Sequence, residues 1–255
     1  MPTMSATTEQ PILILAPGAW HTPDAYEIVQ EKLHAQGFET RAVAYPSVGA
    51  EPPNKGLFDD AAAVRAEIEV HANQGRQVIV VGHSYGGLVI AEAVKGLGYK
   101  QRKAENKTGG VTLVVYLAAF VTPKGASILK MLGGQPLPWM NFQGEHVIAE
   151  TPEEIFYHDV PADLKEAAIA KLKHQSAPVF RDEVTYQPWE DMDCMYFYCE
   201  DDRALLYPIQ QQLASMLGEN AITYSCKASH SPFLSEPDSV VNGLLHGVKE
   251  VQKRL

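Results

Sequence analysis

The sequence predicts an α/β protein with a doubly wound, mostly parallel β-sheet. Short, fully apolar runs rich in valine, isoleucine and leucine recur along the chain. Such runs are typical of strands that are buried on both faces of a sheet. Segments with helical periodicity, bounded by proline and glycine, separate these runs. Alternation of buried strands with helices predicts parallel pairing, because each helix carries the chain back to the start of the next strand.

Composition and charge limit the domain count and the partners. The chain has 255 residues, of which 45% are hydrophobic and 20% are charged, which fits one large domain or one domain with a modest insertion. The formal net charge of −10 repels nucleic acid and anionic lipid surfaces. We therefore expect a small-molecule substrate, no nucleic-acid or membrane partner, and a monomer or homodimer.

The first half of the chain alternates between strand and helix patterns. Residues 12–15 form an apolar run that stops at Pro17-Gly18, which is typical of a buried strand that ends in a turn. Thr22 is a candidate N-cap, and Pro23 follows at the first helical position. The pattern continues with a strand at 41–45, a loop at 46–56, a helix at 59–73, a strand at 77–81 and a helix at 85–97.

The second half contains an interruption of this rhythm. A polar loop at 99–110 and a strand at 111–117 are followed by aromatics, prolines and short helical patterns such as 162–174. We predict that residues 122–192 form a helical cap inserted into a core of residues 1–121 and 193–255. The doubly wound pattern resumes with a strand at 194–199, a helix at 208–217, a strand at 222–226 and a helix at 237–253.

The pentapeptide Gly82-His83-Ser84-Tyr85-Gly86 lies between a β-branched strand and a helical segment. At a strand-to-helix turn this sharp, the central serine adopts a strained backbone, and a Cβ in place of either glycine collides across the turn. This context predicts that Ser84 is a nucleophile. The alternative is a glycine-rich turn that binds phosphate at a helix N-terminus, but the phosphate-binding signatures are absent. By strand alternation His83 faces away, so we expect it to pack or hydrogen bond at the elbow.

A serine hydroxyl needs a histidine base, and the histidine needs a carboxylate that fixes its tautomer. After an elbow of this kind the acid and then the histidine follow in the chain, in loops after later strands. Asp202 follows the strand at 194–199, and His230 follows the strand at 222–226. Glu200 and Asp201 are the fallback for the acid. Asp202 and His230 complete the predicted catalytic triad.

Oxyanion stabilisation requires two backbone N–H groups directed at the developing charge. We expect these from Tyr85, which follows the nucleophile, and from Ala19 in the loop after the first strand. In the same loop, Gly18 allows a substrate to approach the backbone, and Trp20 either lines the site or packs. In the cap, the aromatic residues either line an apolar substrate pocket or form the core of the cap itself; among them Trp139 and Phe142 are the candidates for substrate contacts.

Cysteine content and the N-terminus indicate the compartment. The three cysteines are too few and odd in number for a disulfide framework. Cys194 and Cys199 lie five positions apart on one strand, so they face opposite sides of the sheet and no metal site is expected. No cofactor is expected either. Residues 1–10 are polar and contain no signal-peptide pattern, which predicts a cytoplasmic protein.

These motifs resemble the α/β-hydrolase superfamily, and within it the small capped enzymes that include plant methyl-ester esterases and hydroxynitrile lyases. The resemblance implies the α/β-hydrolase fold and a Ser-His-Asp enzyme that cleaves a carboxylic ester or lactone. In the cyanogenic lyases of the family a threonine stands at the position of Gly18, and a lysine follows the catalytic histidine, where this chain has Ser231. The alternatives are a lyase or other non-hydrolytic enzyme that uses the same triad, and a ligand receptor whose triad is vestigial.

Overall fold

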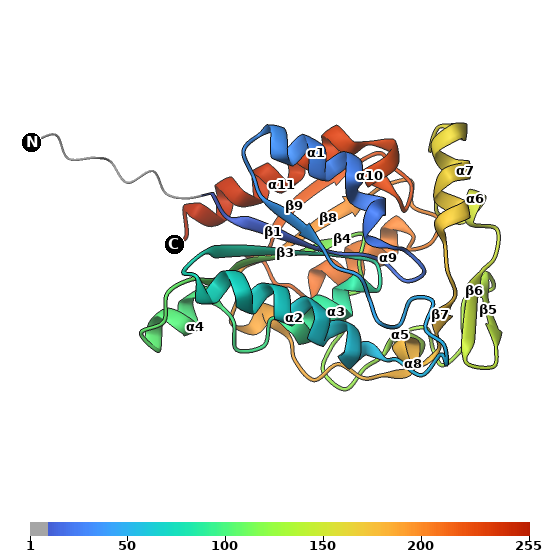
Figure 1. Ribbon diagram of the computed structural model, residues 1–255, viewed down its shortest axis with the longest axis horizontal. Helices are drawn as coiled ribbons and strands as arrows, with labels where there is room; N and C mark the ends of the chain where they lie inside the picture. Colours follow the sequence, from blue (N-terminus) through green and yellow to red (C-terminus); the bar gives the residue numbers. More distant parts are fainter. Residues whose placement is uncertain (1–9) are drawn as a thin grey trace, which may run out of the picture.

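A six-stranded parallel sheet lies at the centre of the protein (Figure 1). The computed structural model describes residues 10–255, so the predicted absence of a signal peptide in residues 1–10 falls almost entirely outside the described part. Every neighbouring pair of strands in this sheet is parallel, which confirms the predicted fold class. The strands, in their order across the sheet, are β2 (Thr40–Ala42), β1 (Ile12–Ala16), β3 (Gln77–His83), β4 (Gly110–Leu117), β8 (Cys194–Cys199) and β9 (Ile222–Cys226).

Helices bury both faces of this sheet. In β1 the side chains of Ile12 and Ile14 pack with α2 (Leu57–Asn73) and α3 (Gly86–Ala93), whereas Leu13 and Leu15 face the helices of the other layer. This alternation explains why the strands are continuous apolar runs, since both sets of side chains must leave water. The other layer contains α1 (Glu27–Ala35) and α11 (Pro237–Gln252), which lie beside each other in Figure 1.

The segment between β4 and β8 lies at one end of the molecule (Figure 1). It contains the expected short helices and also a three-stranded antiparallel sheet, which the sequence patterns did not predict. The strands have only two to four residues, too few for a period-two pattern to stand out. The elements of the segment are α5 (Ile128–Met131), β5 (Met140–Gln143), β6 (His146–Ala149), α6 (Pro152–Ile155), α7 (Ala162–Lys171), β7 (Gln175–Ser176), α8 (Pro178–Arg181) and η2 (Pro188–Glu190).

Several boundaries differ from those predicted. A helix, α4 (Tyr99–Ala104), replaces the beginning of the loop predicted at 99–110. The buried guanidinium of Arg102 stabilises this turn, because its Nε donates to the carbonyl of Gly109 at 3.1 Å. Thr22 is the N-cap of a 3₁₀ helix, η1 (Pro23–Tyr26), but its side chain makes no capping hydrogen bond. Two further helices complete the fold: α9 (Tyr207–Ser215) and α10 (Pro232–Ser235).

Among residues 10–255, no helix combines the length and the apolar composition that crossing a membrane requires.

Candidate active site

Ser84 lies at the sharp turn between β3 and α3. Its backbone φ is 54°, in the left-handed region that is strained for a residue with a Cβ. The flanking glycines allow this turn, since a Cβ on Gly82 would lie 2.5 Å from the carbonyl oxygen of Gly86. A Cβ on Gly86 would lie 2.6 Å from the carbonyl oxygen of Ala16. The pentapeptide therefore forms the predicted elbow.

The structure pairs His230 with Asp202. His230 Nδ1 donates to Asp202 Oδ2 at 2.6 Å, and both side chains are almost completely buried. The other carboxylate oxygen, Oδ1, accepts the backbone N–H groups of Ala204 at 2.7 Å and Leu205 at 2.9 Å. With Nδ1 of His230 held as a donor, Nε2 is left as the nitrogen that can accept a proton.

The neighbouring acids have other surroundings. The Glu200 carboxylate accepts a hydrogen bond from Ser225 Oγ at 2.8 Å. Asp201 is exposed, and its backbone carbonyl accepts a hydrogen bond from the His158 ring at 2.8 Å. Of the three adjacent acids, the structure thus brings Asp202 to His230.

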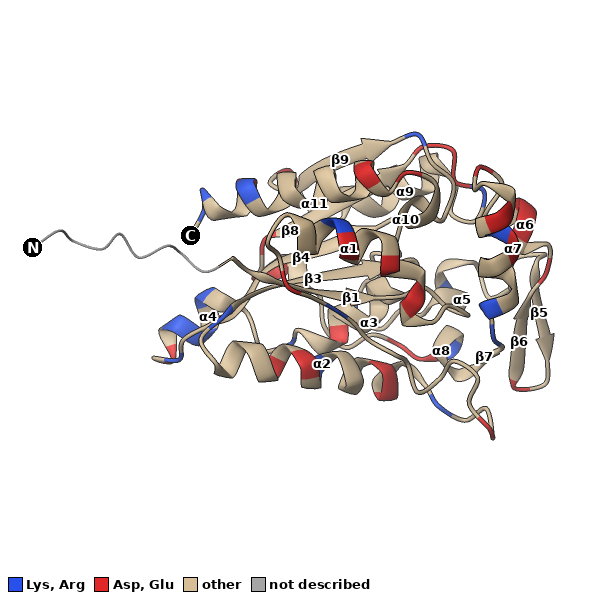
Figure 2. Cartoon of the chain, turned by 45° about the horizontal axis from the view of Figure 1, so that its top comes forward, with Lys and Arg blue, Asp and Glu red and all other residues tan. Residues whose placement is uncertain are grey.

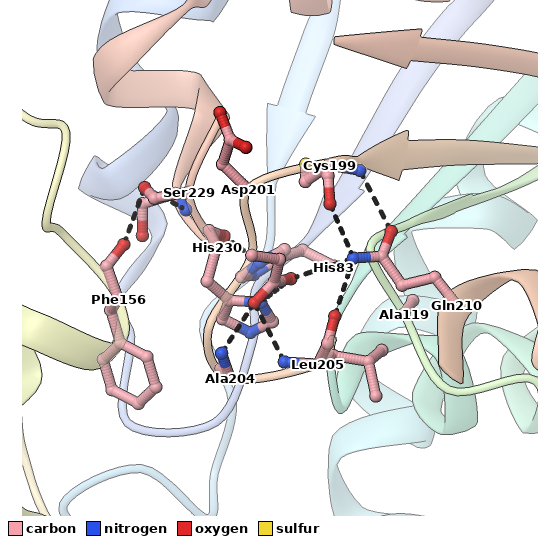
Figure 3. A network of polar contacts seen from close by, with 12 residues as sticks. His83, Ala119, Phe156, Cys199, Asp201, Ala204, Leu205, Gln210, Ser229 and His230 are labelled. Atoms are coloured by element: carbon pink, nitrogen blue, oxygen red, sulfur yellow. Dashed lines mark hydrogen bonds and ion pairs between the residues drawn. The ribbon is translucent and has the colours of Figure 1, made fainter. Parts of the chain in front are cut away.

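Gln210, on the buried side of α9, fixes the loop that carries Asp202. Figure 3 shows its amide between Cys199, at the end of β8, and Leu205. Gln210 Oε1 accepts the N–H of Cys199 at 3.0 Å, and Nε2 donates to the carbonyl oxygens of Cys199 at 2.8 Å and Leu205 at 2.7 Å. Sequence analysis missed this residue, although Gln210 is three and four positions before the buried Leu213 and Ala214 on the same face.

The segment between β4 and β8 holds the loop that carries His230. Ser229 Oγ donates to the carbonyl of Phe156 at 3.0 Å, a contact drawn in Figure 3. The Ser229 N–H donates to the Asp159 carboxylate at 2.7 Å. The position of His230 therefore depends on residues that are distant in sequence.

Two further buried histidines, His83 and His21, lie near His230. His83 Nε2 donates to the carbonyl oxygen of His230 at 2.7 Å, which is the hydrogen bond at the elbow that the sequence predicts. Burial lowers the pKa of His83 well below its usual range. Burial also lowers the pKa of His21 to about 4. Its Nδ1 donates to the Ala19 carbonyl at 2.7 Å, so the neutral ring accepts the Tyr157 hydroxyl at Nε2, also at 2.7 Å.

Ser84 and His230 line one apolar pocket. Ala19 and Tyr85, the predicted oxyanion donors, lie in its wall, together with Trp20 and with Trp139 from the segment between β4 and β8. Trp20 Nε1 donates to the carbonyl of Val147, which ties this wall to β6. The remaining lining residues are Phe120, Ile128, Leu132, Leu137, Met140, Phe180, Ala204 and Leu205.

Two predicted substrate residues lie behind this lining. Phe142 packs on Phe180, which lines the pocket, with ring centroids 5.8 Å apart. Gly18 lies against the elbow, where a Cβ would be 2.7 Å from His83 Nδ1 and 3.2 Å from the Cβ of Ser84. Gly18 therefore allows its loop to approach the nucleophile.

A buried polar network connects the two segments that contain the predicted oxyanion donors. The Tyr85 hydroxyl donates to Asp60 at 2.7 Å, and the N–H of Ser47 donates to the same carboxylate at 3.0 Å. Gln175 then joins Ser47 Oγ to the backbone of Trp20, with Nε2 donating at 2.6 Å and Oε1 accepting at 3.1 Å. Asp60 is four residues before Val64 on the buried face of α2, a signal that the sequence analysis overlooked.

The pH dependence of stability tests the burial of Asp60. Burial raises the pKa of this carboxyl from 3.8 to about 6, so ionisation destabilises the folded state as pH rises through this range. Relative to Asp60→Asn, the wild type should lose about 2 kcal/mol of unfolding free energy between pH 4 and pH 7, measured by urea denaturation.

The adjacent Asp59 is a matched control. A hydrogen bond from the N–H of Gly56 lowers the pKa of Asp59, so its stabilising contribution is lost as pH falls. The difference between wild type and Asp59→Asn should therefore change with pH in the opposite direction. A difference between wild type and Asp60→Asn that stays constant from pH 4 to pH 7 contradicts the assignment.

In the described part of the chain, one cluster of three side chains could hold a metal ion. The donor atoms of Glu51, His146 and His174 all lie within 4.8 Å of one another. His146 Nε2 already contacts Glu51 at 3.0 Å, and the three residues lie outside the lining of the Ser84 pocket. Cys194 and Cys199 belong to opposite core layers, as predicted, so they do not form a joint site.

Comparisons with known proteins agree with this fold. A model described as the alpha/beta hydrolase family matches residues 13–243. A protein named alpha/beta hydrolase nvfD, from Aspergillus novofumigatus, is 30% identical over 94% of this chain and 98% of its own length.

Solved structures extend the similarity to enzymes from bacteria and plants. A pyrethroid hydrolase from Sphingobium faniae superposes with a TM-score of 0.72 at 22% identity, covering 94% of this chain and 97% of the other. A methylesterase from Arabidopsis superposes with a TM-score of 0.72 at 19% identity, covering 94% and 99% of the two chains. With a nucleophile elbow, a buried His–Asp pair and a family match over most of its length, this chain belongs to the alpha/beta hydrolase family.

Proposed function

We propose that the protein is a serine esterase that hydrolyses a carboxylic ester or lactone of a small, hydrophobic molecule through an acyl-enzyme at Ser84. The observation that carries the proposal is the His230–Asp202 hydrogen bond of 2.6 Å beside a pocket that Ser84 and His230 both line. An uncharged, apolar lining favours a neutral substrate.

The chemistry follows from the roles of these groups. His230 Nε2 removes the proton of Ser84 as Oγ attacks the ester carbonyl carbon, and the N–H groups of Ala19 and Tyr85 stabilise the oxyanion. The C–O bond to the alcohol breaks, and His230 returns its proton to the departing oxygen. A water molecule, deprotonated by His230, then attacks the acyl carbon. The bond between this carbon and Ser84 Oγ breaks, Oγ takes the proton from His230, and the acid leaves.

Relatives and local packing both support hydrolysis over the lyase alternative. The similar proteins include a pyrethroid hydrolase and a methylesterase. Gly18 leaves no space for the threonine that marks the cyanogenic lyases, because a Cβ there would stand 2.7 Å from the His83 ring. Ser231, after the catalytic histidine, supplies no cation.

Comparison of two substrates tests the proposal. Release of p-nitrophenol from p-nitrophenyl butyrate is expected, and release of cyanide from mandelonitrile is not. Cleavage of mandelonitrile by a protein that leaves esters intact would contradict the proposed activity and favour the lyase alternative.

A further inference from the structure

An apolar groove lies beside the Ser84 pocket. Phe120, Leu132, Leu137, Ala204 and Leu205 line both hollows, so the two share a wall. Farther out, the groove runs along α9. The cavity volume is about 20 Å³ in the inner pocket and about 570 Å³ in the outer groove. The inner pocket is therefore narrow, whereas the volume of the outer groove lies in the range of small-molecule sites.

The outer groove is uncharged. Its lining contains no lysine, arginine, aspartate or glutamate. Figure 2 shows α9 without a charged residue along its whole length, although the protein has a net charge of −10. Two large apolar side chains of this groove are exposed to solvent, Leu206 by 56% and Ile209 by 43%. Covering such surface stabilises a complex by about 25 cal/mol per Å².

One wall of the groove is rigidly connected to the catalytic acid. The backbone N–H groups of Ala204 and Leu205 donate to Asp202, and Gln210 holds the Leu205 carbonyl. A hydrocarbon chain that lies on this wall therefore has a fixed position relative to the His230–Asp202 pair. This preorganisation suits a substrate whose reacting carbonyl must reach Ser84.

We propose that this groove, defined by Leu132, Leu137, Leu206, Ile209, Leu213 and Met216, binds a long apolar arm of the ester substrate while its carbonyl lies at Ser84. The proposal rests on the proposed esterase function and narrows its substrate class to neutral esters with an extended hydrocarbon arm. The five lining residues that the groove shares with the Ser84 pocket favour the substrate, rather than a partner protein, as the occupant.

Two graded series of esters test the groove. One series lengthens the acyl chain of p-nitrophenyl esters from acetate to decanoate, and the other lengthens the alcohol of alkyl acetates. The wild-type kcat/KM should rise with chain length in the series whose arm enters the groove. Ile209→Ser should lower kcat/KM for the longest substrate of that series by about tenfold. It should leave kcat/KM for the shortest substrate of the same series within about twofold of the wild type.

Val70→Ser is the matched control. Val70 is a β-branched residue on α2 that is 51% exposed and lines neither hollow, so its replacement should leave both series unchanged. Because Ile209 is also partly exposed, circular dichroism should show that both variants retain the fold.

Three outcomes overturn the groove proposal. The first is an Ile209→Ser variant whose kcat/KM falls equally for short and long esters, or for neither. The second is a changed oligomeric state of that variant with unchanged chain-length dependence, which assigns the groove to a protein interface. The third is a wild type whose kcat/KM rises with chain length in neither series, which removes the long arm but leaves the esterase function standing. Absence of ester turnover altogether overturns both proposals.

Discussion

Ser84→Ala should lower kcat for p-nitrophenyl butyrate by about 10⁴-fold or more, because in the proposed mechanism the acyl-enzyme forms on the oxygen of this hydroxyl. Turnover that remains reflects substrate binding and the oxyanion donors. The variant should keep its fold, since the Ser84 side chain is not part of the elbow's backbone hydrogen bonds to Leu117 and Phe120. Stopped-flow or steady-state measurement of p-nitrophenol release gives the change in kcat.

Ser231→Ala is the control for this prediction. Ser231 is buried and lies next to His230, and its hydroxyl makes no hydrogen bond among residues 10–255. Its removal should change kcat by no more than about threefold. An equal loss in both variants would show that the Ser84→Ala effect comes from general disturbance of the site rather than from loss of the nucleophile.

Asp202→Asn should lower kcat by about 10³- to 10⁴-fold with little change in structure. The carboxylate accepts hydrogen bonds from His230 Nδ1 at 2.6 Å and from two backbone N–H groups. An amide in this place offers an N–H group and favours the tautomer of His230 that carries its proton on Nε2, which can no longer receive the proton of Ser84.

Asp201→Asn separates the charge of this loop from the specific contact. Asp201 is adjacent and exposed, so its replacement should leave kcat within about twofold of the wild type. A larger loss of kcat in Asp201→Asn than in Asp202→Asn would show that Asp202 is not the catalytic acid. If the effect acts through His230, the pH profile of kcat/KM should change in Asp202→Asn and match that of the wild type in Asp201→Asn.

The sheet and the nucleophile elbow were predictable because their signals are local. A buried parallel strand must be apolar on both faces, and a sharp strand-to-helix turn requires glycine where a Cβ collides. Gly82 and Gly86 satisfy that requirement, and the left-handed φ of Ser84 follows from it. The loop positions of Asp202 and His230 were predictable from the order of the strands.

The surroundings of the site were harder to predict because they depend on contacts between distant segments. The residues Phe120, Ile128, Leu132, Leu137 and Ala204 line the pocket, but nothing in their local pattern distinguishes a pocket wall from ordinary core packing. The three-stranded antiparallel sheet depends on strands too short to show a period, although Gly144, at φ 65° in the turn between β5 and β6, is a typical hairpin residue.

Two buried polar residues are marked in the sequence by their positions on apolar helix faces. Asp60 and Gln210 occupy the apolar faces of α2 and α9, in register with Val64 and Leu213. A polar residue at a core position of a helix must find hydrogen-bond partners. Here Asp60 accepts the Tyr85 hydroxyl, and Gln210 donates to Leu205 in the loop that carries Asp202. Searching helix faces for such residues would have identified both.

Labelling with a fluorophosphonate probe tests the central claim most directly, because the probe phosphonylates an activated serine with loss of fluoride. Peptide mapping of the labelled wild type should place the phosphonate on Ser84, and His230→Ala should react far more slowly. A folded protein that stays unlabelled, or that carries the label on another residue, would contradict the assignment of Ser84 as the nucleophile.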